Sequence, residues 1–137
     1  MRWLIVLSLF ASSVVWADCP DLKGLYRVCK RQDGVIRKVL IRQKQKDGAT
    51  VYTIAWSEER TEILIADGVT RVTPVFDTGM EIHLTATCDE ENVLHKSMQM
   101  VGSNVAFDEK YWFDNNQLRF ESRDAGGVIE DIVCKRP

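Results

Sequence analysis

Two histidines, His83 and His95, are the natural candidates for a general base in this sequence. His83 stands between Ile82 and Leu84, and His95 follows Leu94, so both imidazoles should lie on the polar, outward face of a strand. Across a hairpin that turns at residues 89–92 they would be three or four residues out of register, about 10 Å or more along the strands. We therefore predict no catalytic residues, no cofactor and no bound metal.

Acidic residues are numerous, but they concentrate where turns are expected, as at Asp33, Asp47, Asp67, Asp77 and Asp89. Turn geometry and solubility account for carboxylates at such positions. The spacing of a dedicated calcium loop is absent, and so is a glycine-rich phosphate loop. The formal net charge of −2 gives no electrostatic footprint for nucleic acid, which we exclude as a partner.

Four cysteines, Cys19, Cys29, Cys88 and Cys134, carry the most definite chemistry in the sequence. Their spacing matches neither a structural zinc site nor a Cys-x-x-Cys redox pair. An even number of cysteines in an exported chain predicts two disulfides. Three pairings are open.

Strand ends in an alternating meander sort to two rims, and this favours one pairing of the cysteines. We expect Cys88 to meet Cys134 at a shared rim, and Cys29 to take Cys19 by a fold-back of the segment between them. The alternative is Cys29–Cys134 across the seam between the first and last strands, which would leave Cys19 for Cys88.

Residues 1–17 have the layout of a secretory signal peptide. Arg2 precedes an apolar run, and Val15-Trp16-Ala17 places small or aliphatic residues at the −3 and −1 positions of a cleavage site. The apolar run is shorter than the roughly 20 residues that span a bilayer. We expect cleavage after Ala17, a single domain over 18–137, a secreted or periplasmic location and no membrane anchor.

Turn signals such as Asp33-Gly34, Asp47-Gly48 and Asn115-Asn116 recur through the remaining chain. They divide it into segments of strand length at the spacing typical of sandwiches and barrels. We predict an all-β fold: an antiparallel up-and-down meander of about 8–10 strands forming a barrel or flattened barrel, linked by disulfides. The first and last strands can then pair and close the sheet, while Pro74 makes 69–76 an edge, a bulge or a poor strand.

Period-two alternation marks the side chains that should face the interior. The pattern is cleanest over 80–88, where apolar and polar residues alternate, and Lys96 is the one exception on the apolar side of its segment. The expected inward residues are also the candidates for lining a ligand site: Tyr26, Tyr52, Ile54, Trp56, Ile82, Leu84, Met98, Met100 and Phe120. Tyr111-Trp112-Phe113 must place aromatic rings on both faces of its strand.

Gly24-Leu25-Tyr26 opens the first expected strand, and a chain of hairpins follows. This resembles the lipocalin/calycin group, whose first strand begins Gly-x-Trp; Tyr26 stands in place of the tryptophan, and the group's C-terminal helix is missing. The order Cys19-Pro20, Leu22, Gly24, Tyr26, Cys29 is also similar to that of small exported bacterial β-barrel proteins. The resemblance implies the barrel architecture over the whole chain after the signal peptide.

Two functions are consistent with these features. The first is a non-enzymatic exported barrel that binds a small apolar ligand in its interior. The second is a protein-binding module, such as an inhibitor of a secreted hydrolase; lysozyme-inhibiting barrels share a tyrosine and a cysteine near the start and a cysteine near the end, as Tyr26, Cys29 and Cys134 do here. An interior cavity of several hundred Å3 would favour the ligand-binding function, and a filled interior would favour the protein-binding one.

Overall fold

The computed structural model describes residues 18–75 and 79–136, so the expected signal peptide lies outside the described residues. Within them the chain forms ten antiparallel strands and no helix that is long and apolar enough to cross a membrane. The strands are β1 (Gly24–Arg31), β2 (Ile36–Lys46), β3 (Ala49–Ala55), β4 (Thr61–Ala66), β5 (Arg71–Val75), β6 (Met80–Cys88), β7 (Leu94–Met100), β8 (Ala106–Asp114), β9 (Gln117–Asp124) and β10 (Gly127–Lys135).

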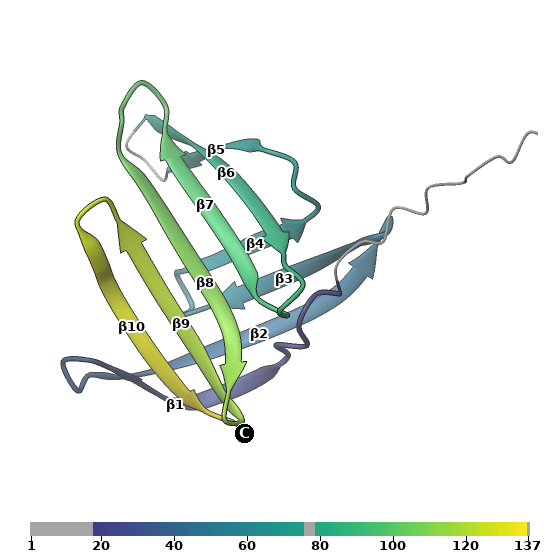
Figure 1. Ribbon diagram of the computed structural model, residues 1–137, viewed down its shortest axis with the longest axis vertical. Helices are drawn as coiled ribbons and strands as arrows, with labels where there is room; N and C mark the ends of the chain where they lie inside the picture. Colours follow the sequence, from purple (N-terminus) through teal and green to yellow (C-terminus); the bar gives the residue numbers. More distant parts are fainter. Residues whose placement is uncertain (1–17, 76–78, 137) are drawn as a thin grey trace, which may run out of the picture.

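One sheet contains all ten strands in the order β4-β3-β2-β1-β10-β9-β8-β7-β6-β5. Each strand pairs with its sequence neighbours except at β4 and β5, and β1 pairs with β10. The sheet curls so that β1–β4 form one wall and β6–β10 the facing wall (Figure 1). The all-β meander and the pairing of first and last strands are thus confirmed, and the result is a curled half-barrel.

Closure of the sheet is incomplete, contrary to the expectation that pairing of β1 with β10 would remove both edges. The edges lie instead at β4 and β5, which no ladder joins. Pro74 lies in β5 and cannot donate to a further strand, as expected of an edge. Where the chain passes from β4 to β5, the amide of Gly68 donates to the Ala86 carbonyl of β6 at 3.0 Å. Beyond this connection the two edge strands diverge (Figure 1).

The segment before β1 covers one end of the barrel, which we call the closed end. Leu22 is fully buried there, and its amide donates to the Gln43 side chain at 3.0 Å. Two buried tyrosines hold the same segment from inside, because Tyr52 donates to the Pro20 carbonyl at 2.6 Å and Tyr26 to the Leu22 carbonyl at 2.8 Å. The opposite end, where β6, β8 and β10 begin, is the open end.

The disulfides are Cys19–Cys88 and Cys29–Cys134, so the favoured pairing of Cys19 with Cys29 is wrong. Cys29 and Cys134 are directly opposed partners on β1 and β10, which brings their side chains together across the seam. The N-terminal segment does not fold back towards Cys29. It crosses the closed end and ties Cys19 to the last residue of β6.

Candidate functional site

Aromatic and aliphatic side chains fill the interior next to the closed end. Phe120 contacts Tyr111 at a centroid distance of 4.8 Å and Trp56 edge-on at 5.5 Å. Tyr26, Tyr52, Ile54 and Leu64 are completely buried in the same cluster. These side chains form a packed core.

Charged side chains form the next layer towards the open end. Lys96 points inward from β7 and only 4% of the residue is exposed. Its Nζ donates to Glu62 Oε2 at 2.6 Å and to Glu109 Oε2 at 3.0 Å. Tyr111 Oη donates to the other oxygen of Glu62 at 3.4 Å. A buried ammonium is tolerated here because it has two carboxylate partners on two different strands.

Burial dominates the electrostatics of this layer. It raises the pKa of Glu109 above the ordinary value, although the charges of Lys96 and Arg60 act in the opposite direction. Burial also raises the pKa of Tyr111 strongly, and the nearby carboxylates of Glu109 and Glu62 add to the effect. The Tyr111 hydroxyl therefore remains a neutral hydrogen-bond donor.

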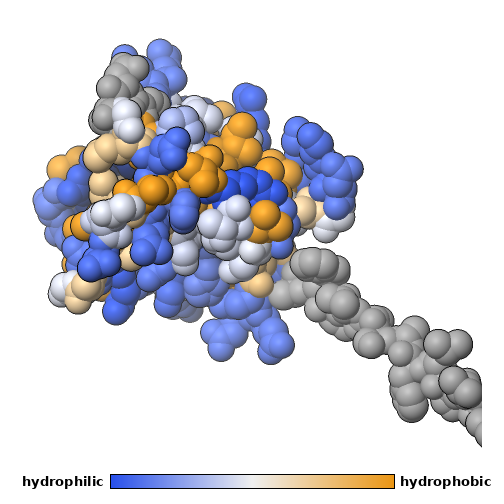
Figure 2. All heavy atoms as spheres, turned by 90° about the horizontal axis from the view of Figure 1, so that it is seen from above, coloured by the Kyte–Doolittle hydropathy of each residue, from blue (hydrophilic) through white to orange (hydrophobic). Residues whose placement is uncertain are grey.

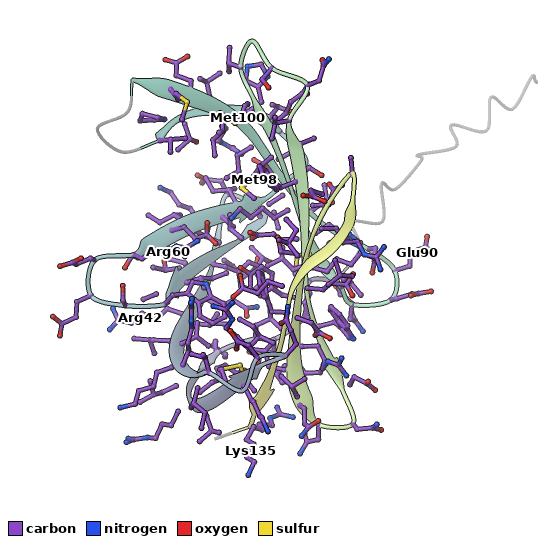
Figure 3. All side chains as sticks on the ribbon, turned by 90° about the vertical axis from the view of Figure 1, so that its left-hand side faces the viewer. Arg42, Arg60, Glu90, Met98, Met100 and Lys135 are labelled. Carbon is purple, nitrogen blue, oxygen red and sulfur yellow. A yellow bond between two sulfur atoms is a disulfide. The ribbon has the colours of Figure 1, made fainter. Side chains whose placement is uncertain are left out.

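Above the charged layer the interior opens into a cavity of about 380 Å3, which we call the cup. Most of its lining is apolar and comes from β5–β8 and β10, and Arg60 reaches it from the connection before β4. Figure 3 shows Met98 and Met100 following one another along the upper half of the interior, with Arg60 below them on the side of β3 and β4. The lining residues are Arg60, Val75, Met80, Ile82, Met98, Met100, Phe107, Glu109, Ser122, Ile129 and Glu130.

A smaller polar crevice of about 30 Å3 lies below the cup. Arg60, Glu109 and Glu130 line both spaces, so the crevice continues the floor of the cup. Arg37 and Lys96 complete its charged lining, over the aromatic cluster of the core. The interior thus has three levels along the barrel axis: a packed core, a charged layer and an open apolar cup.

Exposed apolar side chains surround the mouth of the cup. Met80, Val101, Val105, Val128 and Ile129 are all 43–49% exposed, and all lie where β6, β8 and β10 begin or β7 ends. Figure 2 looks onto this end and shows hydrophobic side chains gathered in the middle of the face, among hydrophilic ones. Apolar surface therefore extends from the cavity to the solvent.

The expected lining residues separate into three groups. Ile82, Met98 and Met100 line the cup. Trp56 and Phe120 lie at the boundary of core and crevice. Leu84 packs against the core, while Tyr26, Tyr52 and Ile54 are buried within it and do not line the cavity.

Sequence reasoning missed the charged layer and part of the cup. Lys96 breaks the alternation of its segment, and Glu109 is its direct partner in the β7–β8 hairpin, so the two together could have indicated an inward ion pair. Glu62 is 34 residues from Lys96 in sequence and reaches it only because β4 packs against β6. Phe107 shares the inward parity of Tyr111 and could have been predicted to face the interior.

The outer surface carries the remaining candidates. Trp112 is half-buried beside Arg119, whose guanidinium carbon lies 5.9 Å from the ring centroid, and it borders a shallow groove together with Lys110 and His95. His95 Nε2 is 2.6 Å from Asp89 Oδ2. Burial alone would raise the pKa of Asp89, but hydrogen bonds from His95 and from backbone amides outweigh it, and the pKa is lowered.

The predicted separation of the two histidines agrees with the ladder between β6 and β7. His83 is opposite Gln99, and His95 is opposite Thr87, which is four residues from His83. Within residues 18–75 and 79–136 no three histidine, cysteine, aspartate or glutamate side chains are grouped as metal ligands.

Comparison with known proteins identifies the fold. No protein-family profile and no curated sequence matches the chain. Two solved structures are similar in fold. A secretory abundant heat soluble (SAHS) protein from Ramazzottius varieornatus has a TM-score of 0.60 and 13% identity, over 77% of this chain and 76% of that one. Human cRBP IV, a cellular retinol-binding protein, has a TM-score of 0.58 and 13% identity, over 85% of this chain and 98% of that one. The chain therefore has a lipocalin/calycin-like fold.

Proposed function

We propose that this protein is an exported, non-enzymatic binding protein that holds a small apolar ligand in the cup. The observation that carries the proposal is the cup itself, an open cavity of about 380 Å3 with a mostly apolar lining. Cavities of about 300–1,000 Å3 with a few convergent polar groups are typical of small-molecule sites.

The composition of the lining supports the same function. Met80, Met98 and Met100 all contribute to the cup, together with Ile82 and Phe107. Methionine side chains are unbranched and polarisable, so they can adapt to ligands of different shape. One of the two similar folds belongs to a protein that is named for binding retinol, which is also a small, largely apolar molecule.

Inhibition of a secreted hydrolase is less well supported. That function would be favoured by a filled interior and an aromatic side chain on an exposed loop. Here the interior is partly open, and Trp112 lies in the middle of β8, half-buried beside Arg119. Both observations favour a small-molecule ligand over a protein partner.

Titration with N-phenyl-1-naphthylamine, a neutral apolar dye that fluoresces in apolar surroundings, tests the proposal. We expect saturable binding to the mature protein. Met98→Trp should weaken it about tenfold or more, because an indole would fill the cup. Gln99→Trp is the matched control, since Gln99 is exposed on the other face of the same strand.

The control variant should bind the dye within about twofold of the wild type, and thermal unfolding should show that both variants are folded. Absence of saturable dye binding, or equal binding by the wild type and Met98→Trp, would contradict the proposal.

A further inference from the structure

We infer that the outer face of the wall formed by β1, β2 and β3 docks on a lipid surface that carries anionic head groups. This face is separate from the cup, so the inference does not rest on the proposed function. Three features carry it: the segregation of charge, the lack of carboxylate partners for the exposed cations, and the apolar side chains between them.

Charge is distributed unevenly over the sheet. β1 contains three lysine or arginine residues and β2 contains five, whereas β1, β2 and β3 together contain no aspartate or glutamate. The whole chain has 20 acidic and 18 basic residues, so the excess of negative charge lies in the turns and the other strands. The molecule is therefore dipolar, with its positive pole on this wall.

Six of the eight cations point away from the barrel. Alternation along β1 and β2 buries Tyr26, Val39 and Ile41 on the inner face and leaves these cations exposed on the outer face. Figure 3 shows one of them, Arg42, on the outward face of β2. We call the group the basic face; its members are Arg27, Lys30, Lys38, Arg42, Lys44 and Lys46.

The cations of the basic face have no carboxylate partners. Among residues 18–75 and 79–136, none of the six side chains has a carboxylate oxygen within 4.0 Å. Asp33, in the turn before β2, pairs with Arg31 at 3.3 Å, and Asp47 lies in the turn after β2. The charges between these two turns are therefore left to attract an external polyanion.

The extent of the basic face indicates an extended partner. Lys38 and Lys46 are eight residues apart on β2, which is about 27 Å at the rise of an antiparallel strand. A small anion would contact only one or two such groups. A lipid surface with anionic heads meets all of them at once, and each lysine or arginine near such a surface strengthens binding by about fivefold.

Apolar side chains among the cations favour a lipid surface over nucleic acid. Leu25 and Ile36 are 40% and 63% exposed, and Ile36 is directly opposite Lys30 in the β1–β2 ladder. Such side chains can enter the boundary between head groups and acyl chains. A nucleic acid offers no such layer. The aromatic rings that would stack on single-stranded bases are also missing from this face, because Tyr26 and Tyr52, the aromatic residues of β1–β3, are fully buried.

The negative net charge of the chain is compatible with this docking. Exposed charges separated by more than the Debye length, about 8 Å at physiological ionic strength, are largely screened from one another. Acidic side chains such as Asp108 and Glu121 belong to β8 and β9, in the facing wall of the barrel (Figure 1). When the basic face meets a lipid surface, these carboxylates therefore contribute little to the interaction.

Co-sedimentation with vesicles tests the inference on protein that begins at residue 18. The probes are vesicles of phosphatidylcholine alone and vesicles that also contain about 30% phosphatidylglycerol, an anionic lipid. At about 0.1 M salt we expect binding about tenfold or more tighter to the anionic vesicles. Binding should weaken steeply when the salt is raised to about 0.5 M, because the charges are then screened over a shorter distance.

Variants separate the basic face from the charge of the whole molecule. Arg42→Gln/Lys44→Gln should weaken binding to anionic vesicles about tenfold or more, since two cations leave the face. Lys110→Gln/Arg123→Gln is the matched control, because it makes the same change in net charge on β8 and β9 and should bind within about threefold of the wild type. Ile36→Ser should weaken binding about threefold or more and keep its salt dependence.

All variants should retain the affinity for N-phenyl-1-naphthylamine, and thermal unfolding should show that they are folded. Equal binding to vesicles with and without phosphatidylglycerol, or equal losses in Arg42→Gln/Lys44→Gln and in the control, would overturn the assignment of the basic face. Tighter binding to a DNA duplex than to anionic vesicles at the same salt concentration would overturn the lipid partner in favour of nucleic acid. Dye binding without any vesicle binding would overturn the docking and leave the proposed function intact.

Discussion

Replacement of Lys96 by methionine is the most informative perturbation of the interior. The substitution keeps the approximate length of the side chain and removes its charge. Lys96 is 5% exposed at the side chain, and its partners Glu109 and Glu62 are 13% and 31% exposed. Lys96→Met would therefore leave two carboxylates close together with little access to water.

Breaking a buried ion pair by removing one partner costs about 3–5 kcal/mol. Partial exposure of Glu62 lets water compensate some of the loss, so we expect about 3 kcal/mol near neutral pH. The effect should depend on pH. The pKa of Glu109 is already raised in the folded protein, and loss of Lys96 would raise it further.

A raised folded-state pKa means that the protonated form favours folding. Stability linked to Glu109 is therefore fully present below its unfolded-state pKa and is lost as the pH rises through the folded-state value. The deficit of Lys96→Met should accordingly shrink when the pH is lowered towards 5. Lys96→Met/Glu109→Gln should recover part of the loss even at neutral pH, because one of the two carboxylates is gone.

Urea unfolding followed by tryptophan fluorescence and circular dichroism, near neutral pH and near pH 5, measures these differences. Lys44→Met is the control, since it makes the same chemical change at an exposed position of β2 and should alter the free energy of unfolding by no more than about 0.5 kcal/mol. A loss below about 1 kcal/mol for Lys96→Met, or a deficit that grows on acidification, would refute the reasoning.

Two further predictions concern stability. Ile54→Ala should lower the free energy of unfolding by about 2–5 kcal/mol because Ile54 is fully buried, whereas Ile63→Ala, at a site 64% exposed, should lower it by no more than about 0.5 kcal/mol. Equal losses on chemical unfolding would mean that the inward face of the sheet is misassigned. The hydrogen-bonded ion pair with Arg71 is the main reason why the pKa of Asp67 is lowered from 3.8 to about 2. Asp67→Asn should therefore reduce the free energy of unfolding by up to about 1 kcal/mol at neutral pH, after allowance for solvent screening. That cost should disappear in unfolding curves as the pH falls from about 4 to 2, and a cost that persists below pH 2 would contradict the pairing.

The strands were predictable because their signal is local. Alternation over 80–88 and turn pairs such as Asp47-Gly48 and Asn115-Asn116 depend on neighbouring residues only, and each marks a strand or hairpin in the structure. Positive φ angles at Asp47, Asn115 and Asn116 show the backbone conformation that these turn residues favour. Pairing of β1 with β10 followed from the even number of strands.

The disulfides were not predictable because the path of the N-terminal segment is a tertiary property. Alternating strand directions place the strand ends at two rims, but they do not determine that Leu22 is buried across the closed end and that Cys19 thereby reaches Cys88. The opening between β4 and β5 was not predictable for the same reason. It depends on how far the whole sheet curls, and the residue pattern of a single strand does not determine that.

The sequence predicted which side of the sheet the candidate residues face, but not where they lie along the barrel axis. Parity shows that Ile54 and Met98 both point inward, yet Ile54 belongs to the packed core and Met98 to the cup. Their positions along the barrel axis depend on the register of the whole sheet. The inward charge of Lys96 was visible as an exception, whereas its partner Glu62 comes from across the opening of the sheet.

Methyl resonances of methionine offer the most direct test of binding in the cup. Met80, Met98 and Met100 all line the cavity, and Met1, the only other methionine, falls in the expected signal peptide. In protein that begins at residue 18 and is labelled with carbon-13 at methionine methyl groups, titration with N-phenyl-1-naphthylamine should shift all three signals, because the rings of the dye would lie against them. The shifts should saturate together and give the dissociation constant seen by fluorescence. Methyl signals that stay in place while the dye fluorescence saturates would show that the dye binds elsewhere and would contradict the proposed site.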